Sequence, residues 1–298
     1  MLAPLRDYLS PEDPKSSPLL CAIKECCFTR LLVKIDPDGP SFGETQWIVS
    51  EDVNVEHLLD IFTTIEPNSD SVWDACTGLM HHIFWHKHRL AILGPKIEGL
   101  PYHHRSKPEC LFELSRLISF TGYYSESKRL LTLTLELWRE WGDDYEVART
   151  LVYLSSMDRL VSTPKESMRH AKEALEIYER LGGTADQAEC LAALAWPLRD
   201  DNQLDAAEEA ASRATDLLPE KGQEFRACEA HLALGNVYRS KGETKKAIHH
   251  FEAALEVASS SGREDRLFWI YHPWQGCASM KAGLTTHTLT SNAQSHTR

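Results

Sequence analysis

No apolar run in this chain of 298 residues approaches the roughly 18 residues that a membrane-spanning helix needs. The first residues, MLAPLRDYLSPEDP, contain no extended apolar segment of the kind that a secretory signal carries. The eight cysteines include no C-x-x-C pair, which is typical of reduced thiols inside a cell rather than of a disulfide framework. These absences predict a cytoplasmic protein that makes no membrane contact.

An excess of basic residues is also absent. The chain has 32 lysines and arginines against 44 aspartates and glutamates, which gives a formal net charge of -12. Because a nucleic-acid-binding surface needs concentrated positive charge to neutralise phosphates, we expect no nucleic-acid partner. The hydrophobic fraction of 42% is that of a globular protein, which excludes a wholly disordered chain.

A period of 40 residues runs through the chain from about residue 108 to about residue 267. Glycine, leucine and small residues each recur at this spacing. The series are Gly142, Gly182, Gly222 and Gly262; Leu114, Leu154, Leu194 and Leu234; Ser127, Ser167, Ala207 and Ala247; and Thr134, Ala174, Ala214 and Ala254. Self-similarity at one period over four repeats is the signature of a solenoid of stacked supersecondary units.

Each repeat is predicted to contain two helices. In the fourth repeat, apolar residues at helical spacing predict a first helix over 227–241 and a second over 245–260, joined by a turn at Gly242. The small residues of each repeat would let its two helices approach closely. The glycine that closes each repeat stands where a helix end needs a left-handed backbone conformation, which glycine adopts at little steric cost.

The fourth repeat resembles the tetratricopeptide repeat. The residues that fall at the family's signature spacing are Leu234, Gly235, Tyr238, Gly242, Ala247, Phe251 and Ala254. The period exceeds the usual length of about 34 residues, and in this it is similar to the repeats of kinesin light chains and of receptor-type nucleotide-binding proteins. The resemblance implies an all-α, right-handed solenoid of helix-turn-helix repeats and a non-enzymatic function as a scaffold in protein binding.

Residues 1–107 show no repeat and are expected to form a small helical module packed against the first repeat. The helices that apolar spacing predicts there are 17–33, 51–65 and 70–92. Gly94 begins a predicted loop that leads to Lys107 and into the repeats.

The repeats are expected over residues 108–279. They start near residues 108, 148, 188 and 228, and a degenerate fifth begins at 268. Residues 280–298 are polar and aperiodic, so we expect a disordered tail there. The broken fifth repeat would leave an apolar end at Phe268 and Trp269, which supports a second hypothesis, self-association through residues 268–275.

Four short segments of the first part of the chain stand in a distinctive order. They are LAPLRDYLSP, SEDVNVEHLLDIF, LGPKIEGLP and SKPECLFELSRL. This order resembles fungal receptor-type signalling NTPases, in which a NACHT- or NB-ARC-like switch domain precedes tetratricopeptide repeats. No G-x-x-x-x-G-K-[ST] loop occurs in this sequence, so no such loop would hold a nucleotide phosphate. The resemblance therefore implies the sensor or partner-binding part of such a protein, or a truncated relative, without NTPase activity and without a cofactor.

Three arginines stand 40 residues apart near the ends of the first helices, namely Arg159, Arg199 and Arg239. First helices line the concave groove of tetratricopeptide proteins, so these arginines are candidate partner-binding residues, together with Asn236 on the same helical face and Arg116 in the first repeat. Guanidinium groups form bidentate hydrogen bonds with carboxylates, which predicts a protein or peptide partner of acidic character. The alternative is that each arginine pairs with a nearby aspartate of its own chain. Those aspartates are Asp158, Asp200 and Asp201.

A third hypothesis is a metal-dependent enzyme. Six histidines lie within 24 residues, and they are His81, His82, His86, His88, His103 and His104. His82 and His86 are four residues apart on a predicted helix, a spacing that can bring two imidazoles to one metal ion. The glutamate of an H-E-x-x-H motif is absent, which favours solvated or packing histidines, so we expect no catalytic residue and no metal ligand.

Other distinctive residues are expected to pack in the core. Cys110 and Cys190 hold the same repeat position, and buried cysteine usually behaves as a small apolar residue. The same holds for three aromatic residues of the second helices, Trp138, Trp141 and Tyr178. Pro197 lies inside a predicted first helix, which it should kink or shorten because proline removes a backbone donor.

Overall fold

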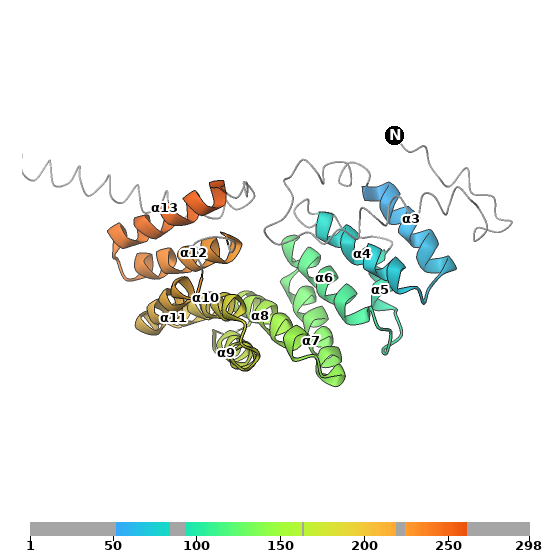
Figure 1. Ribbon diagram of the computed structural model, residues 1–298, viewed down its shortest axis with the longest axis horizontal. Coiled ribbons are helices and arrows are strands. Elements are labelled where there is room, and N and C mark those ends of the chain that lie inside the picture. Colours follow the sequence, from blue (N-terminus) through green and yellow to red (C-terminus); the bar gives the residue numbers. More distant parts are fainter. Residues whose placement is uncertain (1–51, 84–92, 163, 219–223, 261–298) are drawn as a thin grey trace, which may run out of the picture. The chain divides into compact units, whose positions relative to one another are not determined.

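The computed structural model describes four stretches of the chain, residues 52–83, 93–162, 164–218 and 224–260 (Figure 1). Their regular secondary structure is entirely helical, and no strand occurs among these residues. Several predictions fall outside the described residues, namely the helix over 17–33, Gly222, Gly262, the segment 268–275 and the tail 280–298.

The chain divides into two compact units. The N-terminal unit runs to Met157 and the C-terminal unit begins at Asp158, so the division falls inside one helix, α8 (Asp144–Val161). Each unit has an apolar core of its own, and each is described by itself.

The helices of the repeats follow the predicted period. The second helices begin 40 residues apart, and they are α7 (Tyr124–Trp141), α9 (Pro164–Leu181), α11 (Leu204–Asp216) and α13 (Thr244–Ser260). The first helices are α6 (Lys107–Phe120), α8 (Asp144–Val161), α10 (Thr184–Asp200) and α12 (Glu224–Ser240). In the fourth repeat, α12 begins three residues before the expected residue 227, because apolar spacing marks a helix end only weakly.

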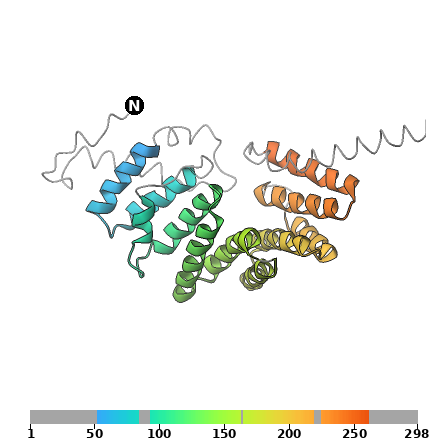
Figure 2. The same cartoon turned by 180° about the vertical axis from the view of Figure 1, so that it is seen from behind.

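Helices that follow one another in the chain pack side by side within each unit. In the C-terminal unit, α10 contacts α9, α11 and α12, and α12 also contacts α11 and α13. In the N-terminal unit, α6 contacts α7, and the pairing is visible from both sides (Figures 1 and 2). Stacked helix pairs of this kind confirm the predicted all-α, helix-turn-helix fold class.

Among the described residues, three helices precede the repeats, namely α3 (Asp52–Ile65), α4 (Asp70–Ile83) and α5 (Leu93–Glu98). The first two confirm the helices expected over 51–65 and in the first part of 70–92. The third lies where a loop was expected from Gly94 onward, so that prediction was wrong for residues 94–98. Leu93 and Ile97 stand one helical turn apart and are both fully buried, which favours a helix. Pro95 is tolerated because it occupies the first turn, where its missing N–H would have no partner within the helix.

The helices before the repeats share one apolar core with the first repeat. Leu59 of α3 and Leu79 of α4 belong to the same buried cluster as Leu111 of α6 and Leu130 of α7. The early helices therefore pack against the first repeat, as expected. The domain boundary at residue 107 stays a prediction.

Small residues are buried where the helices of a repeat meet. The two series predicted for this role are at most 1% exposed, and they are Ser127, Ser167, Ala207 and Ala247, then Thr134, Ala174, Ala214 and Ala254. Gly235 of α12 shows how close the approach is, because a Cβ built on it would lie 2.4 Å from Cε1 of Phe251 in α13. A residue without a side chain is therefore required at this contact.

Left-handed residues end the helices at the predicted places. Gly142 has a φ of 72° and Gly182 a φ of 81°. After α7, the N–H of Gly142 donates to the carbonyl of Arg139 and the N–H of Asp143 donates to that of Trp138, each over 3.2 Å. The left-handed conformation turns the chain so that these donors reach the last carbonyls of the helix.

Pro197 does not shorten its helix. α10 has 17 residues, as many as α12, so of the two expected effects the shortening does not occur, and the kink stays a prediction. The neighbouring Ala195 and Leu198 are buried in the core of the C-terminal unit. Burial of these side chains outweighs the loss of one backbone hydrogen bond near the helix end.

Replacing Gly235 with alanine is expected to lower the free energy of unfolding by about 1–3 kcal/mol, because the new Cβ would overpack against Phe251. Urea denaturation followed by circular dichroism measures this loss. Gly94→Ala in α5 is the control, since its Cβ would lie 3.9 Å from Leu114, an ordinary contact distance. Equal stability of Gly235→Ala and the unchanged protein would contradict the close approach of α12 and α13.

Candidate partner-binding surface

The structure brings Arg159 and Arg199 to a single carboxylate in the C-terminal unit. Arg159 ends α8, whereas Arg199 and Asp200 end α10. Nη1 of Arg159 lies 3.4 Å from Oδ2 of Asp200, and Nε of Arg199 lies 3.0 Å from its Oδ1. One aspartate is therefore shared by two of the three arginines that sequence analysis placed in a row.

The indole ring of Trp196 lies beside both of these arginines. The guanidinium carbon of Arg159 is 5.4 Å from the ring centre, and that of Arg199 is 4.9 Å from it. Both distances are within the range of cation–π attraction. Trp196 is half-buried and packs against the apolar cores of the C-terminal unit, so these contacts involve a ring that the core holds in place.

The other two aspartates named as partners have contacts elsewhere. Asp158 is fully buried, and its Oδ2 is hydrogen-bonded to Nδ1 of His170 in α9. Asp201 accepts a hydrogen bond of 2.7 Å from Nε2 of Gln203. Of the aspartates named as partners, Asp200 is shared by Arg159 and Arg199.

Arg239 is oriented by Asn236, as their placement on one helical face predicts. Nη2 of Arg239 donates to Oδ1 of Asn236 over 2.9 Å. The buried amide of Asn236 in turn donates to the carbonyl of Leu232 over 2.8 Å. Asn236 therefore acts as a positioning residue for an exposed arginine.

Arg116 belongs to a different environment, in the N-terminal unit. Its Nη1 lies 3.1 Å from Oε1 and 2.9 Å from Oε2 of Glu113, and its guanidinium carbon is 5.2 Å from the ring centre of Tyr153. The side chain is only 19% exposed. These contacts favour a structural role for Arg116, and its partner-binding role stays a prediction.

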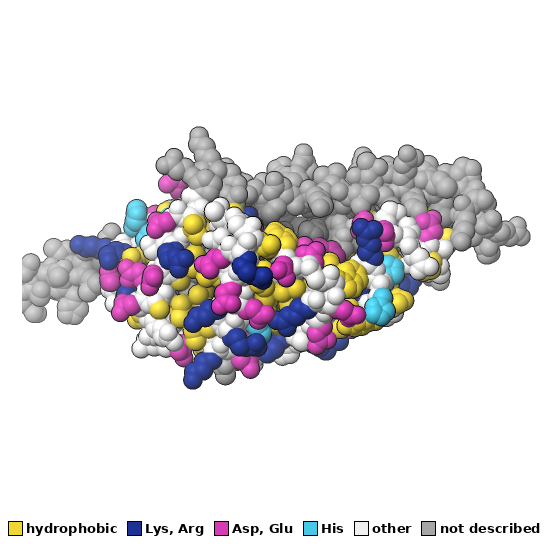
Figure 3. All heavy atoms as spheres, turned by 60° about the horizontal axis from the view of Figure 1, so that its bottom comes forward, with side chains coloured by type: hydrophobic (Ala, Val, Ile, Leu, Met, Phe, Trp, Pro, Cys, Tyr) yellow, Lys and Arg dark blue, Asp and Glu magenta, His cyan; other side chains and the backbone are white. Residues whose placement is uncertain are grey.

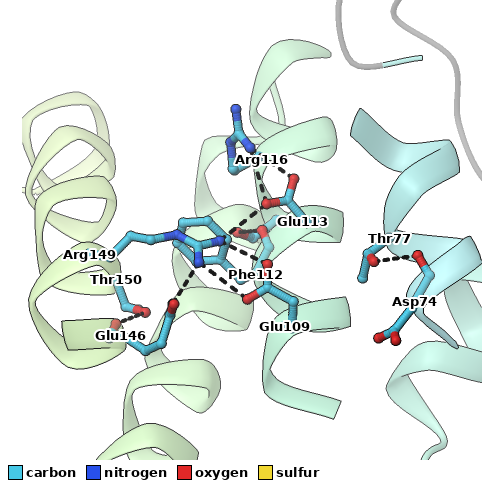
Figure 4. Close-up of polar contacts among 10 residues, drawn as sticks. Asp74, Thr77, Glu109, Phe112, Glu113, Arg116, Glu146, Arg149 and Thr150 are labelled. Carbon is cyan, nitrogen blue, oxygen red and sulfur yellow. Dashed lines mark hydrogen bonds and ion pairs between the residues drawn. The ribbon is translucent and has the colours of Figure 1, made fainter. Parts of the chain in front are cut away.

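Arg149 is the centre of an ion-pair network in the N-terminal unit (Figure 4). Its guanidinium group contacts Glu146 over 2.7 Å, Glu109 over 3.0 Å and Glu113 over 3.3 Å. Its guanidinium carbon also lies 4.0 Å from the ring centre of Phe112. Glu113 is 1% exposed, so the network holds a carboxylate that water does not solvate.

In this network, burial and the neighbouring charges shift the pKa of each group in opposite directions. Burial raises the pKa of Glu146, although the neighbouring Arg149 lowers it. Burial lowers the pKa of Arg149, but the carboxylates of Glu109, Glu113 and Glu146 raise it further, so the guanidinium remains charged. Arg149, together with Arg116, therefore compensates the charge of the buried Glu113, and it also holds the partly buried Glu109 and Glu146.

The network follows from the repeat, although sequence analysis did not identify it. Glu109 and Arg149 stand at the same position of successive repeats. Asp186 and Arg226 form a second pair of this kind in the C-terminal unit, with Nη2 of Arg226 2.8 Å from Oδ1 of Asp186. Nε of Arg226 also donates to Glu189 over 3.1 Å. In the sequence, the two pairs could have been recognised as opposite charges that stand 40 residues apart.

The histidine-rich segment shows no shared site in the described part of the chain. His103 lies 3.9 Å from a carboxylate oxygen of Glu140, whereas His104 packs edge-on against Trp73 at 5.8 Å. The side chains of the other four histidines of this segment lie outside the described residues. Among the described residues, no group of three or more histidine, cysteine, aspartate or glutamate side chains is arranged to hold a metal ion.

A second histidine pair was missed by sequence analysis. Nδ1 of His231 in α12 lies 3.2 Å from Nδ1 of His250 in α13, and the two rings are stacked with their centres 5.4 Å apart. Burial lowers the pKa of both, that of His250 to about 4. The two residues belong to no recognisable motif, so only the packing of α12 on α13 reveals them.

The cysteines and aromatic residues predicted for the core are buried, except for the half-buried Trp141. Cys110 and Cys190 are fully buried, and burial raises the pKa of both thiols well above its ordinary value. Tyr178 and Trp138 are buried as well, and the half-buried Trp141 packs edge-on against Trp138. These residues stabilise the repeats.

Two further observations concern the length and hydrophobicity of the described helices and the distribution of charge on one face of the molecule. None of them is both long and apolar enough to cross a membrane. On the face drawn in Figure 3, basic and acidic side chains are interspersed rather than separated into two regions. Neither sign of charge therefore forms a separate region on this face.

Comparison with known proteins agrees with the helical repeat. The family model described as Tetratricopeptide repeat matches residues 228–261, the fourth repeat. None of the curated proteins compared matches the chain.

Comparison with solved structures finds similar chains at low sequence identity, and the two Rap structures among them share the fold. The chain is similar to a Rap protein complexed with competence and sporulation factor, with 14% identity and a TM-score of 0.59 over 91% of this chain and 77% of that one. It is similar to the apo form of RapI, with 15% identity and a TM-score of 0.54 over 91% of this chain and 74% of that one. BtubC (BKLC) from P. vanneervenii has 15% identity and a TM-score of 0.47 over 82% of this chain and 92% of that one.

The class of protein is therefore clear. The fourth repeat is a tetratricopeptide repeat. The part of the chain that the structure describes has a tetratricopeptide-like helical repeat fold, which the likeness to the two Rap structures supports.

Replacing Arg149 with alanine is expected to destabilise the N-terminal unit by on the order of 2 kcal/mol, because Glu109, Glu146 and the buried Glu113 lose the cation that they share, although Arg116 still contacts Glu113. Urea denaturation measures the loss. Arg129→Ala is the matched control, since Arg129 also contacts two carboxylates, Glu98 and Glu126, but is 50% exposed. Its removal should cost less than about 1 kcal/mol. Equal losses for the two variants would show that the burial of the network does not matter.

The histidine pair predicts a pH dependence of stability. Both imidazoles have a lowered pKa in the folded chain and an ordinary one, near 6.5, in the unfolded chain. The unfolded state therefore takes up protons first, and stability falls as the pH drops below about 6.5 toward 4. His250→Gln should flatten the curve of unfolding free energy against pH over this window. Parallel curves for the variant and the unchanged protein would contradict the effect.

Proposed function

We propose that this chain is a non-catalytic scaffold that binds an acidic segment of a protein partner at the ends of α8, α10 and α12. The observation that carries the proposal is the cluster in which Arg159 and Arg199 share Asp200 beside Trp196. Arg239, held by Asn236, extends the row on α12.

The charges of this cluster favour an anionic partner. Arg159, Arg199 and Arg239 bring three positive charges, and Asp200 offsets one of them. Part of the excess stabilises the helices themselves, since arginine in the last turn interacts favourably with the helix dipole. A carboxylate of a partner can exchange with Asp200 or bind beside it, because guanidinium groups form charge-assisted hydrogen bonds with such groups.

Trp196 gives the same surface an apolar contact. Tryptophan and arginine are the side chains that most often dominate the binding energy of protein interfaces. The ring is partly accessible and its position is set by the core, so a partner would meet it without a large loss of side-chain entropy. We therefore expect the bound segment of the partner to contain acidic residues next to an apolar residue.

The biological setting that we propose rests on resemblance. The segments near the start of the chain resemble fungal receptor-type signalling NTPases, which supports a role as the cytoplasmic sensor part of such a protein. A Rap protein of similar fold is complexed with competence and sporulation factor, which supports ligand binding by this architecture. Self-association through residues 268–275 stays a prediction, because that segment lies outside the described residues.

An array of peptides of graded charge tests the proposal. The full chain is expected to retain acidic peptides over neutral and basic ones, and the triple variant Arg159→Ala, Arg199→Ala, Arg239→Ala should weaken this binding by about tenfold or more, or about 1.4 kcal/mol. Because the contact is electrostatic, rising salt should weaken it as well.

The matched control removes three arginines from second helices, namely Arg139, Arg180 and Arg213. It changes the net charge equally, so it should keep the preference for acidic peptides. Equal loss in both triple variants would assign the preference to net charge alone. Unchanged binding by the first variant would refute the arginine surface.

A further inference from the structure

The last described helix pair brings two imidazoles face to face. His231 lies on α12 and His250 on α13, and their Nδ1 atoms are 3.2 Å apart. The rings are inclined by only 29° and are partly accessible to solvent. No property of the repeat framework requires two histidines here, since the framework positions that face α12 and α13 are small or apolar.

We propose that His231 and His250 form a two-histidine binding site for a divalent transition-metal ion of the zinc class. A metal–nitrogen bond of 2.0 to 2.1 Å places two imidazole nitrogens of one ion about 2.9 to 3.4 Å apart, for angles between square and tetrahedral. The observed separation of 3.2 Å lies in this range. Imidazole suits zinc, copper and nickel, whereas magnesium and calcium prefer oxygen ligands.

The protonation of the pair suits a cation. Burial lowers the pKa of both histidines, so both rings are neutral near pH 7. Without metal, the two Nδ1 atoms can share one proton in a hydrogen bond. When an ion binds, the ring that carries its proton on Nδ1 takes the tautomer with the proton on Nε2. No net proton is then released, and both Nδ1 lone pairs face the ion.

The surroundings hold the second ring in place. Tyr238 stacks on His250 with ring centres 5.4 Å apart and an inclination of 13°. The hydroxyl of Tyr238 donates to Glu208 over 2.9 Å, which fixes the tyrosine. Lys246 lies over the Tyr238 ring, and its charge is countered by Glu243 at 2.6 Å. The geometry of the pair is therefore largely formed before an ion arrives.

The site is open rather than closed. His249 lies edge-on to His250 with ring centres 5.2 Å apart, but no group of three or more histidine, cysteine or carboxylate side chains among the described residues is arranged to hold a metal ion, so water would complete the coordination. A two-ligand site binds its ion reversibly. Because its ligands come from α12 and α13, the ion would join the two helices of the fourth repeat and stabilise the folded state, which alone presents both nitrogens together.

Calorimetric titration of the full, chelator-treated chain with zinc chloride tests the site. The double variant His231→Gln, His250→Gln is expected to bind one equivalent of zinc fewer than the unchanged protein, and zinc should no longer raise its melting temperature by several degrees. The matched control is His103→Gln, His104→Gln from the histidine-rich segment, which should keep both effects of the α12–α13 pair. Equal zinc stoichiometry in the first variant and the unchanged protein would overturn the proposal.

A measurement on the unchanged protein guards against a variant that fails to fold. Paramagnetic cobalt(II), added below one equivalent to the isotope-labelled chain, is expected to broaden the amide signals around residues 231 and 250 before others. Broadening that begins elsewhere and leaves these signals sharp would refute the site independently of any substitution.

Discussion

The close approach of paired helices at small, buried side chains is the constraint on which the rest of this structure depends. Serine, threonine and alanine occupy the meeting points of every repeat, and at Gly235 even a single Cβ would collide with Phe251. These meeting points recur every 40 residues, so each first helix takes the same position in its repeat. Equivalent residues of neighbouring first helices thereby come within reach of one another inside each compact unit.

Because equivalent positions of neighbouring first helices lie close together, opposite charges at those positions form ion pairs between helices. Glu109 meets Arg149 in the N-terminal unit, and Asp186 meets Arg226 in the C-terminal one. In a chain with 44 acidic and 32 basic residues, packing first helices side by side would concentrate negative charge. The repulsion between these carboxylates and the loss of their hydration are unfavourable. An arginine that contacts two or three carboxylates offsets both, because each acid gains a charge-assisted hydrogen bond in place of those to water.

The candidate binding surface combines an arginine that recurs every 40 residues with a neighbouring position that differs between repeats. At the position that Trp196 holds in the third repeat, the other repeats have Arg116, Ser156 and Asn236. Framework positions must stay small or apolar because helices pack there, whereas this position carries a different side chain in every repeat. The histidine pair of α12 and α13 is likewise peculiar to one repeat. A repeat protein of this kind uses its framework for shape and its variable positions for recognition.

The sequence alone determined the period, the helix pairs, the buried small residues and the left-handed ends at Gly142 and Gly182, because local spacing and backbone sterics decide these features. It named the arginine row as well. Only the tertiary structure showed that two of these arginines share Asp200, that α5 is a helix, and that His231 faces His250. Such contacts depend on how side chains of neighbouring helices are oriented toward one another. The spacing of residues along the sequence does not specify those orientations.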